Sequence, residues 1–367
     1  MRVGELRNAR DGERAARLAS GDSLTGRRTG KKDDGIALMD QTIAALSMSA
    51  RVARAIRQEG WTGEIMAVHP HSVYVTDEDD EIYAIVRQPL GNGPLNLVIP
   101  AEPAHLFNGL ALGTSLASTG VTLGVGDGIT IGLDAAVVWE SKARAVLAAD
   151  GALVERSLAV LCREVSQRAP AESLARLLPH LDDEDLPEPL DQVPHFPRSH
   201  ALISGLAESL AQRDRRRLKV VTSSLAGLGP GLTPAGDDFI AGVLLSLALV
   251  RAQRGDPALT EIAHMLVETA APRTHEISAA YLRAAYDGQV GERWDPLLQT
   301  LAAGDADHIT AAAGPVLATG ETSGADMLAG FVVGFGVLQG GGSTAAWRAP
   351  AAADGPAPSA TPLRPAG

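Results

Sequence analysis

The sequence predicts an α+β protein in which a β-rich N-terminal domain, a small barrel or sandwich, is followed by a larger, mainly α-helical domain. Three observations support this fold class. Short apolar or alternating runs separated by turn residues fill 61–139, apolar residues recur at helical spacing after residue 141, and only 4% of the 367 residues are aromatic. A core with so few rings is built from Ala, Leu and Val, so close backbone contacts are expected.

Composition sets the expected domain boundaries. Residues 1–45 are charged and Gly-rich and lack an apolar cluster, which predicts a disordered leader. Residues 340–367 are rich in Gly, Pro and Ala and predict a disordered tail. Between them we expect a β-rich domain at 46–140 and a helical domain at 141–339.

Strand patterns in the β-rich domain lie at 65–68, 73–76, 82–87, 95–99, 116–123, 129–132 and 135–139. The acidic stretch at 77–80 is typical of a hairpin turn between two of them. This number of short strands favours a small antiparallel barrel or sandwich. Helical periodicity follows at 152–167, 199–218, 238–253, 258–270, 275–287, 294–303 and 326–338.

Charge and composition exclude several classes of protein. The net charge of 32 − 44 = −12 argues against nucleic-acid binding and against an anionic membrane surface. The longest apolar run, 239–250, is shorter than the ~20 residues that span a bilayer. The single cysteine, Cys162, allows no internal disulfide and no cysteine metal cluster. These features predict a cytoplasmic protein with no membrane segment.

The sequence contains an internal repeat of a short motif. Residues 236–242 read Gly-Asp-Asp-Phe-Ile-Ala-Gly, and residues 324–330 read Gly-Ala-Asp-Met-Leu-Ala-Gly. Both fit Gly-x-Asp-x-apolar-Ala-Gly, both follow a hydroxyl-bearing stretch, and both begin a strongly apolar helix. We expect the two helix starts to face one cavity.

The first copy of the motif has features typical of an anion site. Gly229, Gly231 and Gly236 allow the backbone N–H groups to approach a ligand closely. Thr233 is a suitable N-cap for the following helix, whose unpaired N–H groups and dipole favour a phosphate or carboxylate. The adjacent carboxylates of Asp237 and Asp238 can orient an amine, hold a divalent metal, or cap the helix.

Plainer explanations exist for each of these residues. Aspartate at a helix start is commonly a cap, and small residues on an apolar helix commonly mark tight packing. A third polar cluster at 273–278 contains Thr274 and Ser278, which serve either a ligand or the helix start itself. His69 and His71 have strand spacing suited to a metal, but the sequence offers no third ligand. We therefore predict no metal site, although a divalent metal at the aspartates is possible.

The stretch at 227–242, Gly-Leu-Gly-Pro-Gly-Leu-Thr-Pro-Ala-Gly-Asp-Asp-Phe-Ile-Ala-Gly, resembles the AllH family, which includes a subunit of the bacterial oxamate carbamoyltransferase of allantoin breakdown. Shorter stretches at 274–282, 320–330 and around 93–95 also fit, so the resemblance covers about residues 50–338. The family usually has Ser where this chain has Ala235. A hydroxyl at that position is therefore not indispensable here.

The resemblance implies a function in carbamoyl transfer, in which oxalurate and phosphate give oxamate and carbamoyl phosphate. It also implies partner subunits, one of them related to succinyl-CoA synthetase. The chain lacks the Ser-x-Arg-Thr loop of ornithine and aspartate carbamoyltransferases. The alternative function is that of a non-catalytic subunit that binds a small carboxylate or acts as a scaffold.

The predicted site joins the 229–238 loop, the 322–326 loop and the helix start at 273–278. Asp237 and Asp238 are the predicted catalytic residues, with Asp237 nearer the ligand and Asp238 structural or shared between the repeats. The predicted ligand is carbamoyl phosphate, oxamate or a similar small anion, with no identified cofactor. The predicted binding residues are Gly229, Gly231, Thr233, Gly236, Thr274, Ser278, Thr322, Ser323, Gly324 and Asp326.

Overall fold

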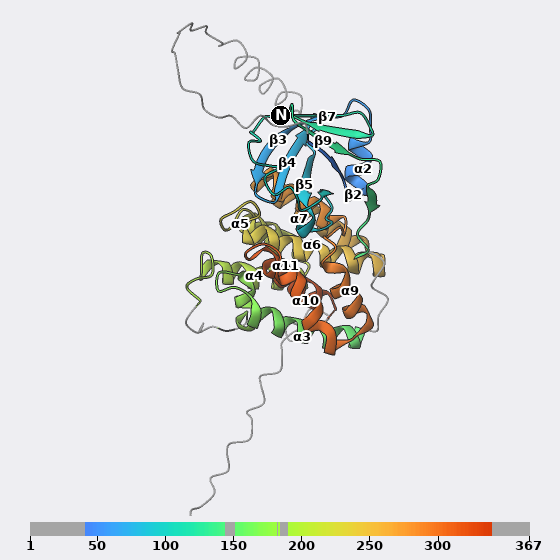
Figure 1. The fold of residues 1–367 in the computed structure, drawn as a ribbon. Coiled ribbons are helices and arrows are strands. Elements are labelled where there is room, and N and C mark those ends of the chain that lie inside the picture. The colour runs from blue at the N-terminus through green and yellow to red at the C-terminus, as the bar shows by residue number, and fades with distance from the viewer. Residues whose placement is uncertain (1–40, 144–150, 182, 184–189, 340–367) are drawn as a thin grey trace, which may run out of the picture. The chain divides into compact units, whose positions relative to one another are not determined.

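The computed structural model describes residues 41–143, 151–181, 183 and 190–339. It begins with a β-rich part and continues with a helical part (Figure 1). The strands are β1 (Gln41–Ala44), β2 (Ser47–Ser49), β3 (Thr62–His69), β4 (Ser72–Asp77), β5 (Ile82–Arg87), β6 (Asn96–Ile99), β7 (Ser115–Ser118), β8 (Thr122–Val125), β9 (Ile129–Gly132) and β10 (Val137–Trp139).

The helices are α2 (Ala50–Ile56), α3 (Gly151–Arg168), α4 (Arg198–Ala211), α5 (Arg215–Leu225), α6 (Ala235–Arg254), α7 (Pro257–Ala270), α8 (Glu276–Tyr286), α9 (Trp294–Ala303), α10 (Ile309–Leu317) and α11 (Ser323–Gln339). Short 3-10 turns join them: η1 (Gln88–Leu90), η3 (Leu174–His180), η4 (Ala271–Arg273) and η5 (Ala306–His308). The α+β fold class is therefore confirmed.

The described strands form one sheet in the order β1-β9-β8-β7-β3-β4-β5-β6-β2-β10. Consecutive strands β1 and β2 lie near opposite ends of this order, although only two residues separate them. Three Cα–Cα steps span at most about 11 Å, so the two ends of the sheet must lie close together. The sheet is therefore curled like a barrel, and three of its pairings, β1–β9, β5–β6 and β2–β10, are parallel rather than antiparallel.

Two boundaries in the β-rich part differ from expectation. Residues 41–45, expected in a disordered leader, contain β1 and bond to β9, so that part of the prediction is wrong; residues 1–40 lie outside the described residues. The run at 116–123 is two strands rather than one. Gly120, with φ of +87°, makes the turn between β7 and β8.

Strand β5 connects the two parts of the fold because both of its faces are buried. Tyr83 and Ile85 pack into the interior of the curled sheet. Ile82, Ala84 and Val86 lie in a second cluster that includes Ile277 and Ala280 of α8. This accounts for the continuous apolar character of β5 and places α8 against the outside of the sheet.

Helices α6 and α11 form the centre of the helical part. Most residues of both are buried, and their side chains share one core with the surrounding helices. The sequence of each helix is therefore apolar on all sides rather than amphipathic. These are the two helices that begin with the repeated motif.

The repeat produces a reciprocal crossing of α6 and α11. A Cβ added to Gly242 would lie less than 3 Å from the carbonyl oxygen of Met327. A Cβ added to Gly330 would lie equally close to the carbonyl oxygen of Phe239. Phe239 and Met327 occupy the same position in the two copies, so each glycine admits the backbone of the other helix.

Two helix predictions need correction. The run at 199–218 is divided into α4 and α5, because the side chain of Asp214 caps α5 by accepting the N–H groups of Arg216 and Arg217. Helix α10 was not predicted, since Gly314 and Pro315 are typical helix breakers. The predicted tail at 340–367 lies outside the described residues.

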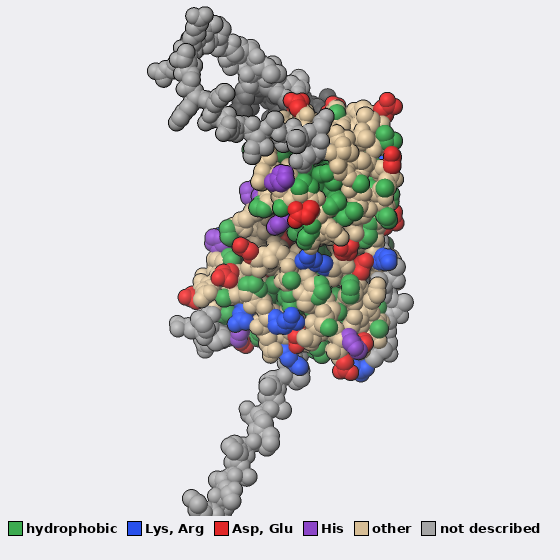
Figure 2. Space-filling model, in the orientation of Figure 1, with side chains coloured by type: hydrophobic (Ala, Val, Ile, Leu, Met, Phe, Trp, Pro, Cys, Tyr) green, Lys and Arg blue, Asp and Glu red, His purple; other side chains and the backbone are tan. Residues whose placement is uncertain are grey.

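The dense basic run at the start of α5 is largely paired with acidic residues. Arg213, Arg215 and Arg217 form ion pairs with Asp256 (3.1 Å), Glu261 (2.8 Å) and Glu208 (2.6 Å), respectively. Figure 2 shows acidic and basic side chains interspersed on the visible face. Within the described residues, no helix has the length and apolar character needed to cross a bilayer.

Candidate functional site

A cavity of about 270 Å³ lies where α6, α8 and α11 meet the outside of the sheet. Both copies of the repeated motif contribute to it, as expected. Its apolar lining comes mainly from Val86, Leu90, Pro94, Ala241, Ala285, Val290, Trp294 and Met327. Its polar lining is formed by Tyr74, Asn92, Asn96, Thr233, Asp238, Tyr281, Gln289, Arg293, Thr319 and Ser323.

Asp238 is the acidic residue among those that line this cavity. Its Oδ2 is buried and has no hydrogen-bond partner. Burial raises the pKa of this carboxyl well above its usual range, and the nearby charge of Asp326 raises it further. The hydroxyls of Ser323 and Thr233 act in the opposite direction on the pKa, and these hydroxyls lie 3.1 Å apart.

Two tyrosines lie beside Asp238 in the cavity lining. Tyr74 comes from β4 and Tyr281 from α8, and the two phenols share a side-chain hydrogen bond. Burial raises the pKa of both, and the charge of Asp238 adds to the rise. The cavity therefore places one carboxyl group and two phenols next to one another.

Arg293 is the cationic residue among those that line the cavity. Its guanidinium donates to the backbone oxygen of Pro89 (2.8 Å) on one side and of Ala318 (3.2 Å) on the other. Within the described part of the chain it has no carboxylate within 4 Å. Its charge is therefore available to an anionic group in the cavity.

Asp237 lies away from the cavity while Asp238 lines it, which is the opposite of the placement expected from the sequence. Asp237 is buried, and the N–H of Gly227 donates to its Oδ1 (2.9 Å). The hydroxyls of Thr274 and Ser278 donate to its Oδ2. This carboxylate ties the glycine loop to the start of α8 and does not line the cavity. Thr274 and Ser278 are thus hydrogen-bond partners of Asp237, and neither lines the cavity.

Asp326, the repeat partner of Asp238, faces a different neighbour. The hydroxyl of Ser173 and the N–H of Leu174 each donate to its Oδ1 at 2.7 Å. The carboxyl therefore satisfies a backbone N–H at the start of η3. Burial raises its pKa to about 6, against the opposing effect of Ser173, Thr322 and Leu174. Asp326 does not line the cavity, but its charge contributes to the raised pKa of Asp238.

The glycine that begins each copy of the motif is required by packing. A Cβ on Gly236 would collide with the carbonyl of Leu225, and one on Gly324 with that of Val316. The N–H of Gly236 donates to Leu228 (2.9 Å) and is therefore not open to an anion. Each glycine lets its helix start pack against the end of the preceding helix.

The remaining glycines of the loop shape its backbone. Gly227, Gly229 and Gly231 have φ values of +74°, +109° and +98°, respectively, a region that side chains disfavour. None of them lines the cavity. Thr233 does line it and does not cap α6, which begins at Ala235 with Pro234 in the cap position.

The structure therefore brings four of the predicted residues to the cavity: Thr233, Asp238, Ser323 and Gly324. The others do not line it: Gly229, Gly231, Gly236, Asp237, Thr274, Ser278, Thr322 and Asp326. The site residues that sequence reasoning missed are Tyr74, Tyr281 and Arg293. Of these three, only Tyr281 could have been found from the sequence, because it lies in the stretch at 274–282 that resembles the family.

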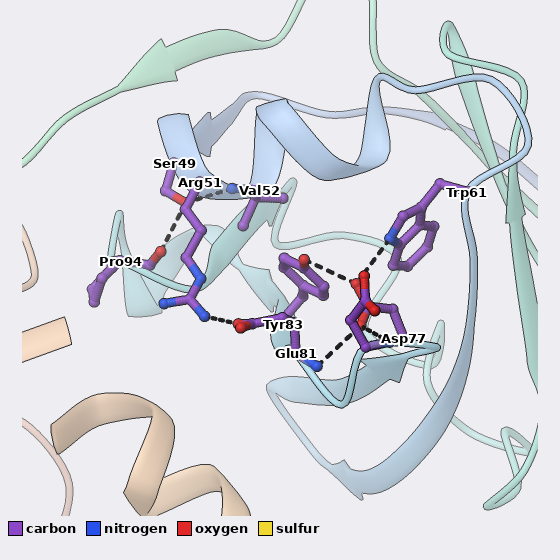
Figure 3. Close-up of polar contacts among 9 residues, drawn as sticks. Ser49, Arg51, Val52, Trp61, Asp77, Glu81, Tyr83 and Pro94 are labelled. Carbon is purple, nitrogen blue, oxygen red and sulfur yellow. Dashed lines mark hydrogen bonds and ion pairs between the residues drawn. The ribbon is translucent and has the colours of Figure 1, made fainter. Parts of the chain in front are cut away.

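Besides the cavity there is a larger groove, of about 830 Å³, which adjoins the β-rich part. Figure 3 shows part of its lining, where Trp61 and Tyr83 converge on Asp77 and Arg51 reaches Glu81. The Oδ2 of Asp77 accepts the indole N–H of Trp61 (3.3 Å) and the hydroxyl of Tyr83 (3.0 Å). Pro94 and Gln289 line both this groove and the smaller cavity.

Neither space resembles a known type of metal centre. Among the described residues, no three or more His, Cys, Asp and Glu side chains gather as a metal ion requires. His69 packs edge-on against the ring of Tyr74.

The fold and the cavity define a two-part α+β protein with a small polar cavity between a curled sheet and a helical bundle. A model of the oxamate carbamoyltransferase subunit AllH matches residues 225–335, and a model of the AllH family N-terminal domain matches residues 44–138. The chain belongs to the AllH family. No solved structure matches it.

Proposed function

We propose that this chain is the subunit of an oxamate-type carbamoyltransferase that holds the carbamoyl compound, and that the cavity around Asp238 is its binding site. The family description supports an oxamate carbamoyltransferase subunit. The single observation that carries the proposal is the pairing, in one small cavity, of a desolvated carboxyl at Asp238 with an unneutralised cation at Arg293.

These two groups complement the two ends of an oxamate-like molecule. A ligand with one carboxylate and one amide places its carboxylate at Arg293, whose planar donors suit it. Its amide then lies among Asp238, Tyr281 and the hydroxyls of Ser323 and Thr233. A cavity of about 270 Å³ accommodates a molecule of this size but not a nucleotide.

The raised pKa of Asp238 gives it a chemical role in this scheme. In the proposed reaction an oxygen of hydrogen phosphate attacks the carbamoyl carbon of oxalurate, the C–N bond to oxamate breaks, and the departing nitrogen takes the proton that the phosphate loses. The carbamoyl oxygen gains negative charge during the attack. A protonated Asp238 donates a hydrogen bond to that oxygen, which an ionised carboxylate cannot do.

The proposal also covers the protein partners, the pathway and the cofactor requirement of the chain. As a subunit the chain has protein partners, and we propose a succinyl-CoA-synthetase-like subunit as one of them. Allantoin breakdown in the cytoplasm is the proposed setting. We propose no resident cofactor, and a divalent metal would enter with the phosphate substrate.

The test compares binding with turnover. Calorimetry should show saturable binding of oxamate to the purified chain and weaker binding to Arg293→Met. Phosphate release from carbamoyl phosphate and oxamate, measured against a protein-free control, then separates the two candidate roles. Turnover by the chain alone favours the enzyme, whereas binding without turnover favours a binding or scaffold subunit. Absence of binding of oxamate and carbamoyl phosphate would contradict the site.

A further inference from the structure

The groove and the cavity meet at two residues, Pro94 and Gln289. Pro94 is the fixed wall. It is buried, and its carbonyl accepts the hydroxyl of Ser49 (2.8 Å), which also caps α2 by accepting the N–H of Val52 (3.1 Å). Figure 3 shows this contact at the side of the groove.

Gln289 is the adjustable wall. Its backbone is held at the end of α8, where its N–H donates to Ala284 and the N–H of the preceding Gly288 donates to Ala285, both at 2.9 Å. Its side chain is exposed and makes no hydrogen bond with any described residue. The side chain is therefore free to turn toward or away from Pro94.

Several side chains that line the groove are held in place by hydrogen bonds to one another. Asp77 holds the rings of Trp61 and Tyr83 through its Oδ2, while its Oδ1 accepts the N–H groups of Asp79 and Glu81 (both 3.0 Å). Arg51 is occupied by Glu81. These side chains are anchored to one another, and no hydrogen bond among the described residues joins them to Gln289.

We propose that the groove is the entry path to the Asp238 cavity and that Gln289 is the gate, passing small amide-bearing molecules and excluding larger ones. The proposal rests on the proposed function only for the identity of the natural ligand. The path is inferred from Pro94 and Gln289, the two residues that line both spaces.

The test uses a thiol placed in the cavity. Ser323→Cys is a conservative change at a half-buried lining residue, and the parent chain, with its single buried Cys162, gives the background rate. Iodoacetamide, a small neutral amide, alkylates the thiolate with loss of iodide. In this background Gln289→Trp should slow alkylation at least tenfold, and Gln289→Ala should leave it equal or faster.

Leu90→Trp is the matched control, because Leu90 lines the cavity without lining the groove and is 42% exposed. It should change the rate less than twofold. Slowing by Leu90→Trp that equals or exceeds that by Gln289→Trp would overturn the path, as would absence of labelling in Gln289→Ala. Circular dichroism verifies folding, and Ala285→Cys provides a second reporter position.

The same labelling experiment tests the proposed ligand separately from the path. Oxamate should protect the Ala285→Cys thiol, a reporter that leaves the Ser323 hydroxyl in place, from alkylation if it occupies the cavity. Labelling that depends on Gln289 but is not slowed by oxamate would support the path and contradict the proposed ligand.

Discussion

Gly242 of α6 and Gly330 of α11 occupy equivalent positions in the two repeats, and each admits the backbone of the other helix. The glycines of the motif that suggested a pair of ligand sites thus allow the two helices to pack closely. The aspartates of the motif, which also occupy equivalent positions, have diverged: Asp326 closes the start of η3, whereas Asp238 lines the cavity.

We predict that Gly242→Ala or Gly330→Ala lowers the free energy of unfolding by about 1–3 kcal/mol or more, because the added methyl collides with a carbonyl. Urea denaturation measures the loss. The double variant should cost less than the sum, since one separation of the helices relieves both collisions. Gly205→Ala in α4 is the control, with ordinary contact distances of 3.5 Å and more, and should not destabilise the protein.

The adjacent aspartates should respond in opposite ways to the same substitution. Asp237→Asn weakens three hydrogen bonds to a buried carboxylate and should cost about 1.5–3 kcal/mol of stability. Asp238→Asn removes a desolvated carboxyl and should leave stability at pH 8 equal or higher. Equal losses in urea denaturation of the two variants would contradict the assigned roles.

Asp326 should make stability depend on pH. Its pKa of about 6 in the folded protein exceeds the usual 3.8, so the folded state binds the proton more tightly. Relative to Asp326→Asn, the parent chain should therefore lose stability as pH rises from about 4 to 7, by up to roughly 3 kcal/mol. Chemical denaturation at several pH values measures the difference, and parallel curves would contradict this account.

Arg293 should distinguish a charged ligand from its neutral analogue. Arg293→Met should weaken binding of oxamate by about 10- to 150-fold, the effect of losing a charge-assisted hydrogen bond. Oxamide has the same shape and no carboxylate, so its affinity should be unchanged by the substitution. Calorimetry with both compounds tests this, and equal losses would show that Arg293 only holds the cavity walls.

The sequence predicted the larger features of the fold because they depend on local patterns. The change from strand-like alternation to helical spacing near residue 141 and the apolar run of β5 are both visible in the chain. Strand β1 was missed because its partner, β9, lies about 90 residues away and only that pairing makes the segment a strand. The parallel pairings escaped prediction for the same reason.

The candidate site was only partly predictable for a related reason. The doubled aspartate marked the correct helix start, but the partners of Asp237 come from α8, which no local pattern could position. Tyr74 and Arg293 belong to unremarkable segments and reach the cavity only through the packing of the sheet against the helices.

The placement of tryptophan gives the protein its own optical reporters. Trp61 and Trp139 line the groove, whereas Trp294 lines the inner cavity and is nearly buried, with its ring edge-on to Phe331. The indole N–H of Trp61 also donates a hydrogen bond to the carboxylate of Asp77. A molecule that passes from groove to cavity should therefore perturb a red-shifted emission before a blue-shifted one, so that rapid-mixing fluorescence on the unlabelled chain would record the two stages in order.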